Sequence, residues 1–194
     1  MKYSLFIIIS SFFVLFSQAQ LSSYQFSPDR QRKAGDALSK KDSIMQTKIN
    51  TPYNFEFKAV SLSGDTITNN DLKGKVTFIN FWMEACAPCL AEKDDLVALY
   101  RTFRINSFFQ FISFTKENSD IARSTVDKYH LPYSVYPIAM DCYRLNYQYG
   151  FPTSLIIGKD GNLKYFNSGM HLDKEKRAQM YKIYYDYIQK LLME

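Results

Sequence analysis

The feature that most constrains this chain is a pair of cysteines at the point where a buried strand is expected to pass into a helix. Residues 76–82 form a nearly continuous apolar run, which is typical of a central strand covered on both faces. Cys86 and Cys89 follow, and apolar side chains then recur at helical spacing. We expect a helix over residues 87–104, with Pro88 in the first turn, where its missing amide hydrogen has no helical partner.

This position gives each cysteine a chemical role. Cys86 would lie at the helix N-terminus, where unpaired amides and the helix dipole favour negative charge. A thiolate is stabilised there, and the thiolate is the nucleophilic form of cysteine. Cys89 would lie one turn later, within reach of a mixed disulfide on Cys86. We therefore expect Cys86 to attack a substrate disulfide and Cys89 to resolve the intermediate.

Metal binding is the alternative use of such a pair. Structural zinc needs two further ligands, and only Cys142, His130 and His171 remain, at irregular spacings. The sequence therefore predicts no metal site and no cofactor other than the Cys86–Cys89 disulfide. We expect Cys142 to be a part-buried free thiol rather than a third redox group, and the two histidines to be surface or packing residues.

The first residues have the pattern of a secretory signal. Lys2 is followed by an apolar run over residues 5–16, and Ser17 and Ala19 place small residues at a cleavage site. That run is about 12 residues, whereas a spanning helix needs roughly 20. We predict a cleaved signal over residues 1–19, with an uncleaved membrane anchor as the alternative. The expected location is periplasmic or otherwise extracytoplasmic, where disulfides can form.

The composition of the chain excludes several other classes of protein. Apolar residues make up 46% of the chain, enough for a sizeable core, and three cysteines are too few for a disulfide scaffold. The net charge of +5 is spread along the chain without a compact basic stripe, so no nucleic-acid binding is expected. Residues 20–50 are predicted to be a polar arm, and residues 51–194 a single domain.

Strand and helix patterns alternate through that domain, which indicates a mixed sheet with helices on both faces. An Asp-Gly step at residues 160–161 marks a closing hairpin. The expected strands are residues 53–60, 66–68, 76–82, 108–114, 133–140, 153–158 and 163–166. The expected helices are residues 87–104, 118–129, 142–149 and 173–192.

Three segments carry a family resemblance. Residues 78–89, FINFWMEACAPC, resemble the active-site segment of thioredoxins. Gly74-Lys75, together with residues 150–153, GFPT, resembles the TlpA/ResA-like exported branch of that superfamily. The resemblance covers about residues 50–192. It implies an α/β fold, the thioredoxin-like three-layer sandwich, with a mixed central sheet, an N-terminal β-hairpin and an inserted helix–strand unit.

The resemblance also implies a substrate-binding surface. Pro152 would be a cis proline facing the cysteine pair, and Phe151 would present its backbone to the substrate chain. Trp82 would pack beside the site. Ala87 and Pro88, between the cysteines, would complete the docking surface and tune the reduction potential.

One departure from the pattern concerns the proton that Cys89 must lose. Thioredoxins carry a buried Asp where this chain has Asn80, and an amide cannot accept a proton. ResA-like proteins often carry Glu between the cysteines, where this chain has Ala87. Glu84 is the nearest acidic residue in the sequence, so it is the predicted proton acceptor, with an exposed glutamate of no role as the alternative.

The resemblance implies an oxidoreductase that exchanges disulfides with the cysteines of exported proteins. We favour a reductase, with an oxidase as the alternative, because the sequence does not give the reduction potential. A membrane thiol carrier would supply electrons, and the chain itself would contact the membrane only if its signal were retained. A metal or haem chaperone using the same cysteines is one alternative. A thiol peroxidase is another, disfavoured because Met83 occupies the position where peroxiredoxins place Thr.

Overall fold

The computed structural model describes residues 39–194. The chain divides into two compact units, Met1–Gln46 and Thr47–Glu194. Of the first unit, residues 39–46 are described, and they are helical. The second unit contains all of the elements discussed below.

The predicted signal over residues 1–19 and most of the predicted arm over residues 20–50 lie outside the described residues. Within residues 39–194, no helix combines the length and the apolar character needed to cross a membrane.

A five-stranded mixed sheet organises the second unit, in the order β5-β4-β3-β6-β7. β3, β4 and β5 are parallel, whereas β6 is antiparallel to β3 and β7 to β6. β1 and β2 form a separate antiparallel hairpin. The strands are β1 (Lys58–Val60), β2 (Thr66–Thr68), β3 (Val76–Trp82), β4 (Phe109–Thr115), β5 (Val135–Pro137), β6 (Thr153–Ile157) and β7 (Leu163–Ser168).

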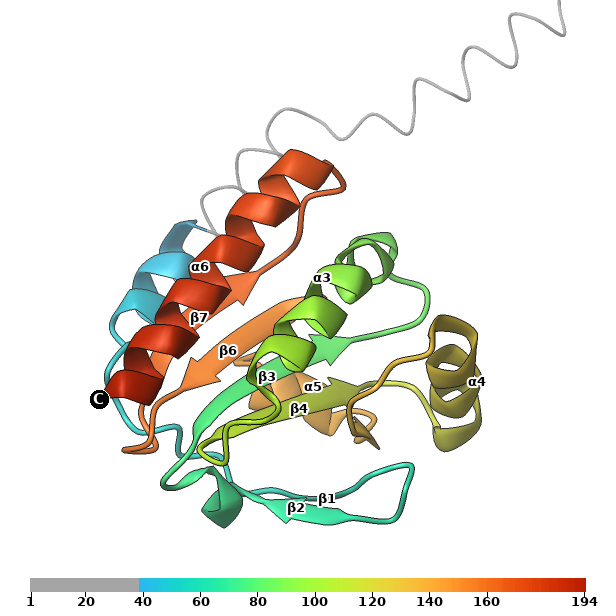
Figure 1. Cartoon of the computed structure of the whole chain (residues 1–194), viewed down its shortest axis with the longest axis horizontal. Coiled ribbons are helices and arrows are strands. Elements are labelled where there is room, and N and C mark those ends of the chain that lie inside the picture. Colours follow the sequence, from blue (N-terminus) through green and yellow to red (C-terminus); the bar gives the residue numbers. More distant parts are fainter. Residues whose placement is uncertain (1–38) are drawn as a thin grey trace, which may run out of the picture. The chain divides into compact units, whose positions relative to one another are not determined.

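Helices lie on both faces of this sheet, as Figure 1 shows. α3 and α6 pack against each other on one face, and α5 lies on the other. The predicted three-layer sandwich is therefore confirmed, as are the N-terminal hairpin and the inserted unit, α4 with β5. The helices are the short 3-10 turn η1 (Asn69–Leu72), α3 (Ala87–Phe103), α4 (Ser119–Tyr129), α5 (Asp141–Leu145) and α6 (Lys174–Met193).

The central strand β3 is buried along its whole length. On the face covered by α3 and α6, Phe78 stacks on Phe111 and meets the ring of Tyr184 edge-on. On the opposite face, Phe81 packs against Phe114. Two-sided burial explains the unbroken apolar run of this strand, and it fixes the strand end that leads to the cysteines.

Several predicted elements are shorter than expected. The strand predicted over residues 53–60 is paired only over Lys58–Val60, and the one predicted over residues 133–140 only over Val135–Pro137. Pro137 has no amide hydrogen to continue a ladder, and Ala139 has a left-handed φ of 45° that turns the chain.

The helix predicted over residues 142–149 is also wrong in its extent, since α5 covers Asp141–Leu145. Tyr147 and Gln148 both adopt left-handed backbone angles, with φ of 58° and 61°. Two successive left-handed residues cannot continue a right-handed helix. They form instead the turn that leads into β6.

Replacing Phe78 with Ala is expected to lower the free energy of unfolding by about 3–5 kcal/mol, because it removes a fully buried ring and leaves a cavity. Chemical denaturation followed by circular dichroism measures the loss. The control is Phe108→Ala, whose ring is 57% exposed and whose removal should cost under about 1 kcal/mol. Equal losses in the two variants would contradict this account of the core.

Candidate active site

The two cysteines form a disulfide in the first turn of α3, with a Cα–Cα distance of 5.2 Å. Cys86 is the N-cap of that helix, and its Sγ accepts a hydrogen bond from the Cys89 amide at 3.2 Å. Both residues are only 6% exposed. Their predicted placement at the junction between strand and helix is confirmed.

The peptide bond between Phe151 and Pro152 is cis, as the resemblance implied. Phe151 packs against the apolar cluster that contains both cysteines. The carbonyl of Gly150 accepts hydrogen bonds from the Thr153 hydroxyl at 2.7 Å and from the Asn146 amide at 3.3 Å. The loop that carries the cis proline is therefore fixed from both sides.

The other predicted surface residues lie around the pair. Trp82 is buried, and its Nε1 donates a hydrogen bond to the Ser113 Oγ at 2.8 Å. Ala87 is exposed and Pro88 is half-buried. Contact of these residues with a substrate stays a prediction.

A buried acidic residue, Glu92, lies in the same helix as the two cysteines and was not among the residues predicted from the sequence. It lies three residues after Cys89, and therefore on the same face of α3. It is 1% exposed, and one carboxyl oxygen accepts a hydrogen bond from the Asn80 amide at 2.9 Å. The other carboxyl oxygen is buried and has no hydrogen-bond partner in the described part of the chain.

The structure gives no support to Glu84 as the proton acceptor. Its side chain is exposed after the end of β3, and its backbone amide donates to the Glu117 carboxylate at 2.9 Å. A carboxylate in solvent is poorly placed to take a proton from a sulfur that is itself buried. Asn80, which stands where thioredoxins have a buried Asp, donates a hydrogen bond to the carboxyl group of Glu92.

Burial raises the pKa of Glu92 from its ordinary value of 4.5 to about 8. The hydrogen bond from Asn80 lowers the pKa and the charge of Asp95 raises it, but loss of water is the largest cause. An acid with a pKa near neutral pH can both accept and return a proton under ordinary conditions.

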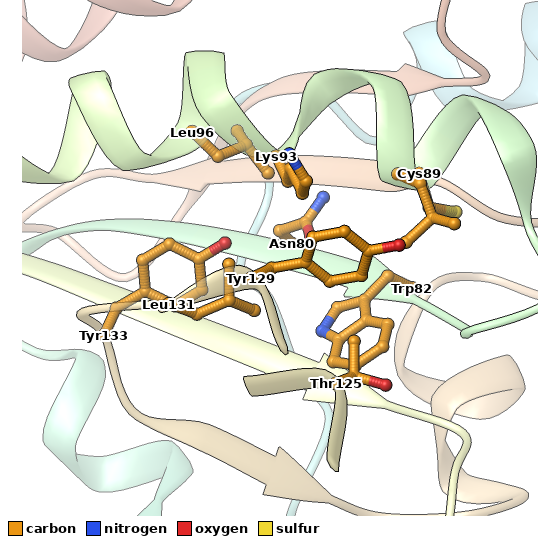
Figure 2. Close-up of a pocket in the computed structure, with 10 residues that line it drawn as sticks. Asn80, Trp82, Cys89, Lys93, Leu96, Thr125, Tyr129, Leu131 and Tyr133 are labelled. Atoms are coloured by element: carbon orange, nitrogen blue, oxygen red, sulfur yellow. The ribbon is translucent and has the colours of Figure 1, made fainter. Parts of the chain in front are cut away.

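A small cavity of about 20 Å³ lies beside Cys89 between α3 and α4 (Figure 2). This volume is about that of one water site. The cavity wall includes Cys89 and Asn80, so it lies between one cysteine of the pair and the residue that holds Glu92. Its lining is Asn80, Trp82, Cys89, Leu90, Lys93, Leu96, Thr125, Tyr129, Leu131 and Tyr133.

The third cysteine and the two histidines are not part of the site around Cys86 and Cys89. Cys142 is a free thiol with no exposed surface, and burial raises its pKa to about 12. It is therefore a poor nucleophile, as the packing interpretation predicted. His130 ends α4 with a left-handed φ of 50°, and His171 is exposed. Among residues 39–194, no group of three or more His, Cys, Asp or Glu side chains is placed to hold a metal ion.

A buried strand that leads into a disulfide-capped helix, next to an inner strand, β6, that begins directly after a cis proline, defines a thioredoxin-like protein with a Cys-x-x-Cys site. The model of the AhpC/TSA family matches residues 51–166, more than half of the chain. The chain belongs to the AhpC/TSA family.

Curated relatives agree with this assignment. The chain is 34% identical to the "Thiol-disulfide oxidoreductase ResA" of Bacillus anthracis over 112 residues, which are 55% of this chain and 62% of that protein. It therefore spans less than two thirds of the length of ResA. It is 26% identical to the "Thioredoxin-like protein YneN" of Bacillus subtilis over 147 residues, 73% of this chain and 83% of that protein.

Solved structures share the fold. A thiol:disulfide interchange protein of the thioredoxin family from Chlorobium tepidum TLS matches with a TM-score of 0.58 and 23% identity, over 75% of this chain and 97% of that one. A thiol:disulfide interchange protein from Bacteroides sp. matches with a TM-score of 0.56 and 16% identity, over 70% and 87%. At these identities the likeness establishes the fold.

Glu92 is expected to make the stability of the oxidised protein depend on pH. The pKa of Glu92 is about 8 in the folded protein, above its ordinary value of 4.5. The contribution of Glu92 to the free energy of unfolding is therefore fully present below pH 4.5 and is lost as the pH rises through about 8. Relative to Glu92→Gln, the free energy of unfolding should fall by about 3 kcal/mol between about pH 5 and pH 8. Denaturant titrations at several pH values test this, and parallel pH profiles for the two proteins would contradict it.

Proposed function

We propose that the chain is an extracytoplasmic thiol–disulfide oxidoreductase that reduces disulfides of exported proteins through Cys86 and Cys89. The observation that carries the proposal is the disulfide in the first turn of α3, with Cys86 as the N-cap. Helix N-termini favour the thiolate, and the second sulfur is close enough to close the bond again. The names of the relatives, among them a thiol-disulfide oxidoreductase, support it.

The exchange has two steps in the reducing direction. The Cys86 thiolate attacks one sulfur of a substrate disulfide, forming a mixed disulfide and releasing one substrate thiolate. Cys89 then gives its proton to the Glu92 carboxylate and attacks the Cys86 Sγ, which releases the second substrate thiolate. The substrate gains two electrons, and the protein is left with the Cys86–Cys89 disulfide seen here.

Glu92 fits the second step because it is buried with the group that it serves. Cys89 and Glu92 lie on the same face of α3, and Asn80 contributes both to the wall beside Cys89 and to the hydrogen bond that holds Glu92. A pKa of about 8 keeps a fraction of this carboxyl ionised at neutral pH, ready to accept the proton.

Location and partners follow from the export signal predicted over residues 1–19. Outside the cytoplasm, the substrates would be cysteines of other exported proteins. A protein that reduces them must be reduced again after each turnover, and a thiol carrier in the membrane is the proposed electron donor. Trp82, Phe151 and Pro152 are proposed to form the surface on which the substrate chain lies.

The Cys89→Ser variant is expected to stop after the first step. Mixed with a peptide disulfide, it should retain the peptide as a stable mixed disulfide on Cys86, which mass spectrometry of proteolytic fragments locates. Cys86→Ser should trap none. Cys142→Ala is the matched control, because that thiol is fully buried, and it should turn over like the wild type. Trapping that persists in Cys86→Ser, or that occurs on Cys142, would overturn the proposal.

A further inference from the structure

We infer that Lys93 and Tyr129 form a positioning pair that favours the thiolate of the resolving Cys89. The inference rests on the proposed exchange reaction and concerns its second step. Neither residue belongs to the Cys-x-x-Cys motif or to the cis-proline loop. Lys93 belongs to α3 and Tyr129 to α4, and both line the cavity beside Cys89.

Lys93 lies four residues after Cys89 in α3, which places the two side chains on neighbouring positions of one helix face. Both line the cavity of about 20 Å³ described above, together with Tyr129 of α4. Lys93 is the basic residue of that lining. A positive charge in a small cavity acts on a nearby sulfur with less screening than it would in open solvent.

The position of the Lys93 ammonium is set by two contacts. It lies 4.8 Å from the centre of the Tyr129 ring, within the range of a cation–π interaction. It also lies 2.7 Å from the Asp94 carboxylate, but the Asp94 side chain is 85% exposed whereas that of Lys93 is 23% exposed. An ion pair to so exposed a partner is weak, so Asp94 does not cancel the positive charge of Lys93.

Tyr129 brings a hydrogen-bond donor to the same place. Figure 2 shows its ring reaching into the cavity, with the hydroxyl directed towards Cys89. A tyrosine hydroxyl can donate to a sulfur anion. The ring of Tyr129 therefore holds the Lys93 cation while its hydroxyl faces the sulfur.

The other titratable groups around Cys89 do not replace this pair. The near titratable side chain on α3 is that of Glu92, and that of Asp95 is more distant. The segment before β5 contributes the phenol of Tyr133. Burial raises the pKa of Tyr133, so its phenol is neutral in the working range. Glu92 is neutral once it has taken the proton. Lys93 then supplies the positive charge opposite the newly formed Cys89 thiolate.

An aryl disulfide that releases a coloured thiolate separates the two steps. Reduced protein attacks it through Cys86, releasing one aryl thiolate at a rate that depends on reagent concentration. Cys89 then displaces the second aryl thiolate from the mixed disulfide at a rate that does not. Both electrons pass from the protein dithiol to the reagent, and the protein ends as the disulfide.

Lys93→Met is expected to slow the second release about tenfold at neutral pH and to move its pH profile upward, because the thiolate loses a nearby opposite charge. The first release should be unchanged, since Cys86 does not line the cavity. Lys93→Arg should restore the second step. Tyr129→Phe keeps the ring and removes the hydroxyl, and should slow the second release about threefold, the loss of one modest hydrogen bond.

Lys128→Met is the matched control. The Lys128 ammonium lies 5.0 Å from the same Tyr129 ring, but this residue does not line the cavity. Both releases should therefore keep their wild-type rates. If Lys93→Met leaves the second release unchanged, or if Lys128→Met slows it equally, the inference is overturned. If the wild type itself shows no second release, the proposed function fails instead.

Discussion

One face of α3 carries ionisable groups into the core, and the arrangement of the site depends on that burial. Cys89, Glu92, Leu96, Leu99 and Phe103 all point inward from this helix. The apolar members hold the helix on the sheet, which gives the two polar members fixed and nearly dry surroundings. Loss of water there is what raises the pKa of Glu92, and the same packing places Cys86 at the helix end, where a thiolate is favoured.

The sheet supplies the other half of this constraint. Asn80 lies in the middle of β3, so its amide is held beneath the helix and donates both to Glu92 and to the Ser154 hydroxyl of β6 at 3.2 Å. A buried carboxyl is costly unless it is hydrogen-bonded or neutral. One oxygen of Glu92 accepts the bond from Asn80, and burial raises the pKa, which favours the neutral form. In the proposed exchange, Asn80 holds Glu92 and Glu92 accepts the proton, whereas the thioredoxin pattern has one buried Asp at the position of Asn80.

The sequence predicted what its patterns encode directly. The run over residues 76–82 and the placement of the cysteine pair are confirmed. The cis bond before Pro152 is also confirmed, but it was implied by the family resemblance alone. Glu92 was missed because acidic candidates were sought by nearness along the chain. Its helical spacing, three residues after Cys89 and four before Leu96, places it on the buried face of α3. The end of α5 was missed because the left-handed angles at residues 147 and 148 fall on side chains that rarely adopt them.

Reversible bridging of Cys86 and Cys89 is the claim from which the rest follows, and equilibration with glutathione buffers of graded composition tests it most directly. After quenching by alkylation, mass spectrometry reports which thiols were free at each composition. The account predicts a single two-electron transition confined to Cys86 and Cys89, lying below the potential of the glutathione couple, with Cys142 alkylated only after unfolding. A pair that cannot be reduced and reformed, or a transition that includes Cys142, would contradict it.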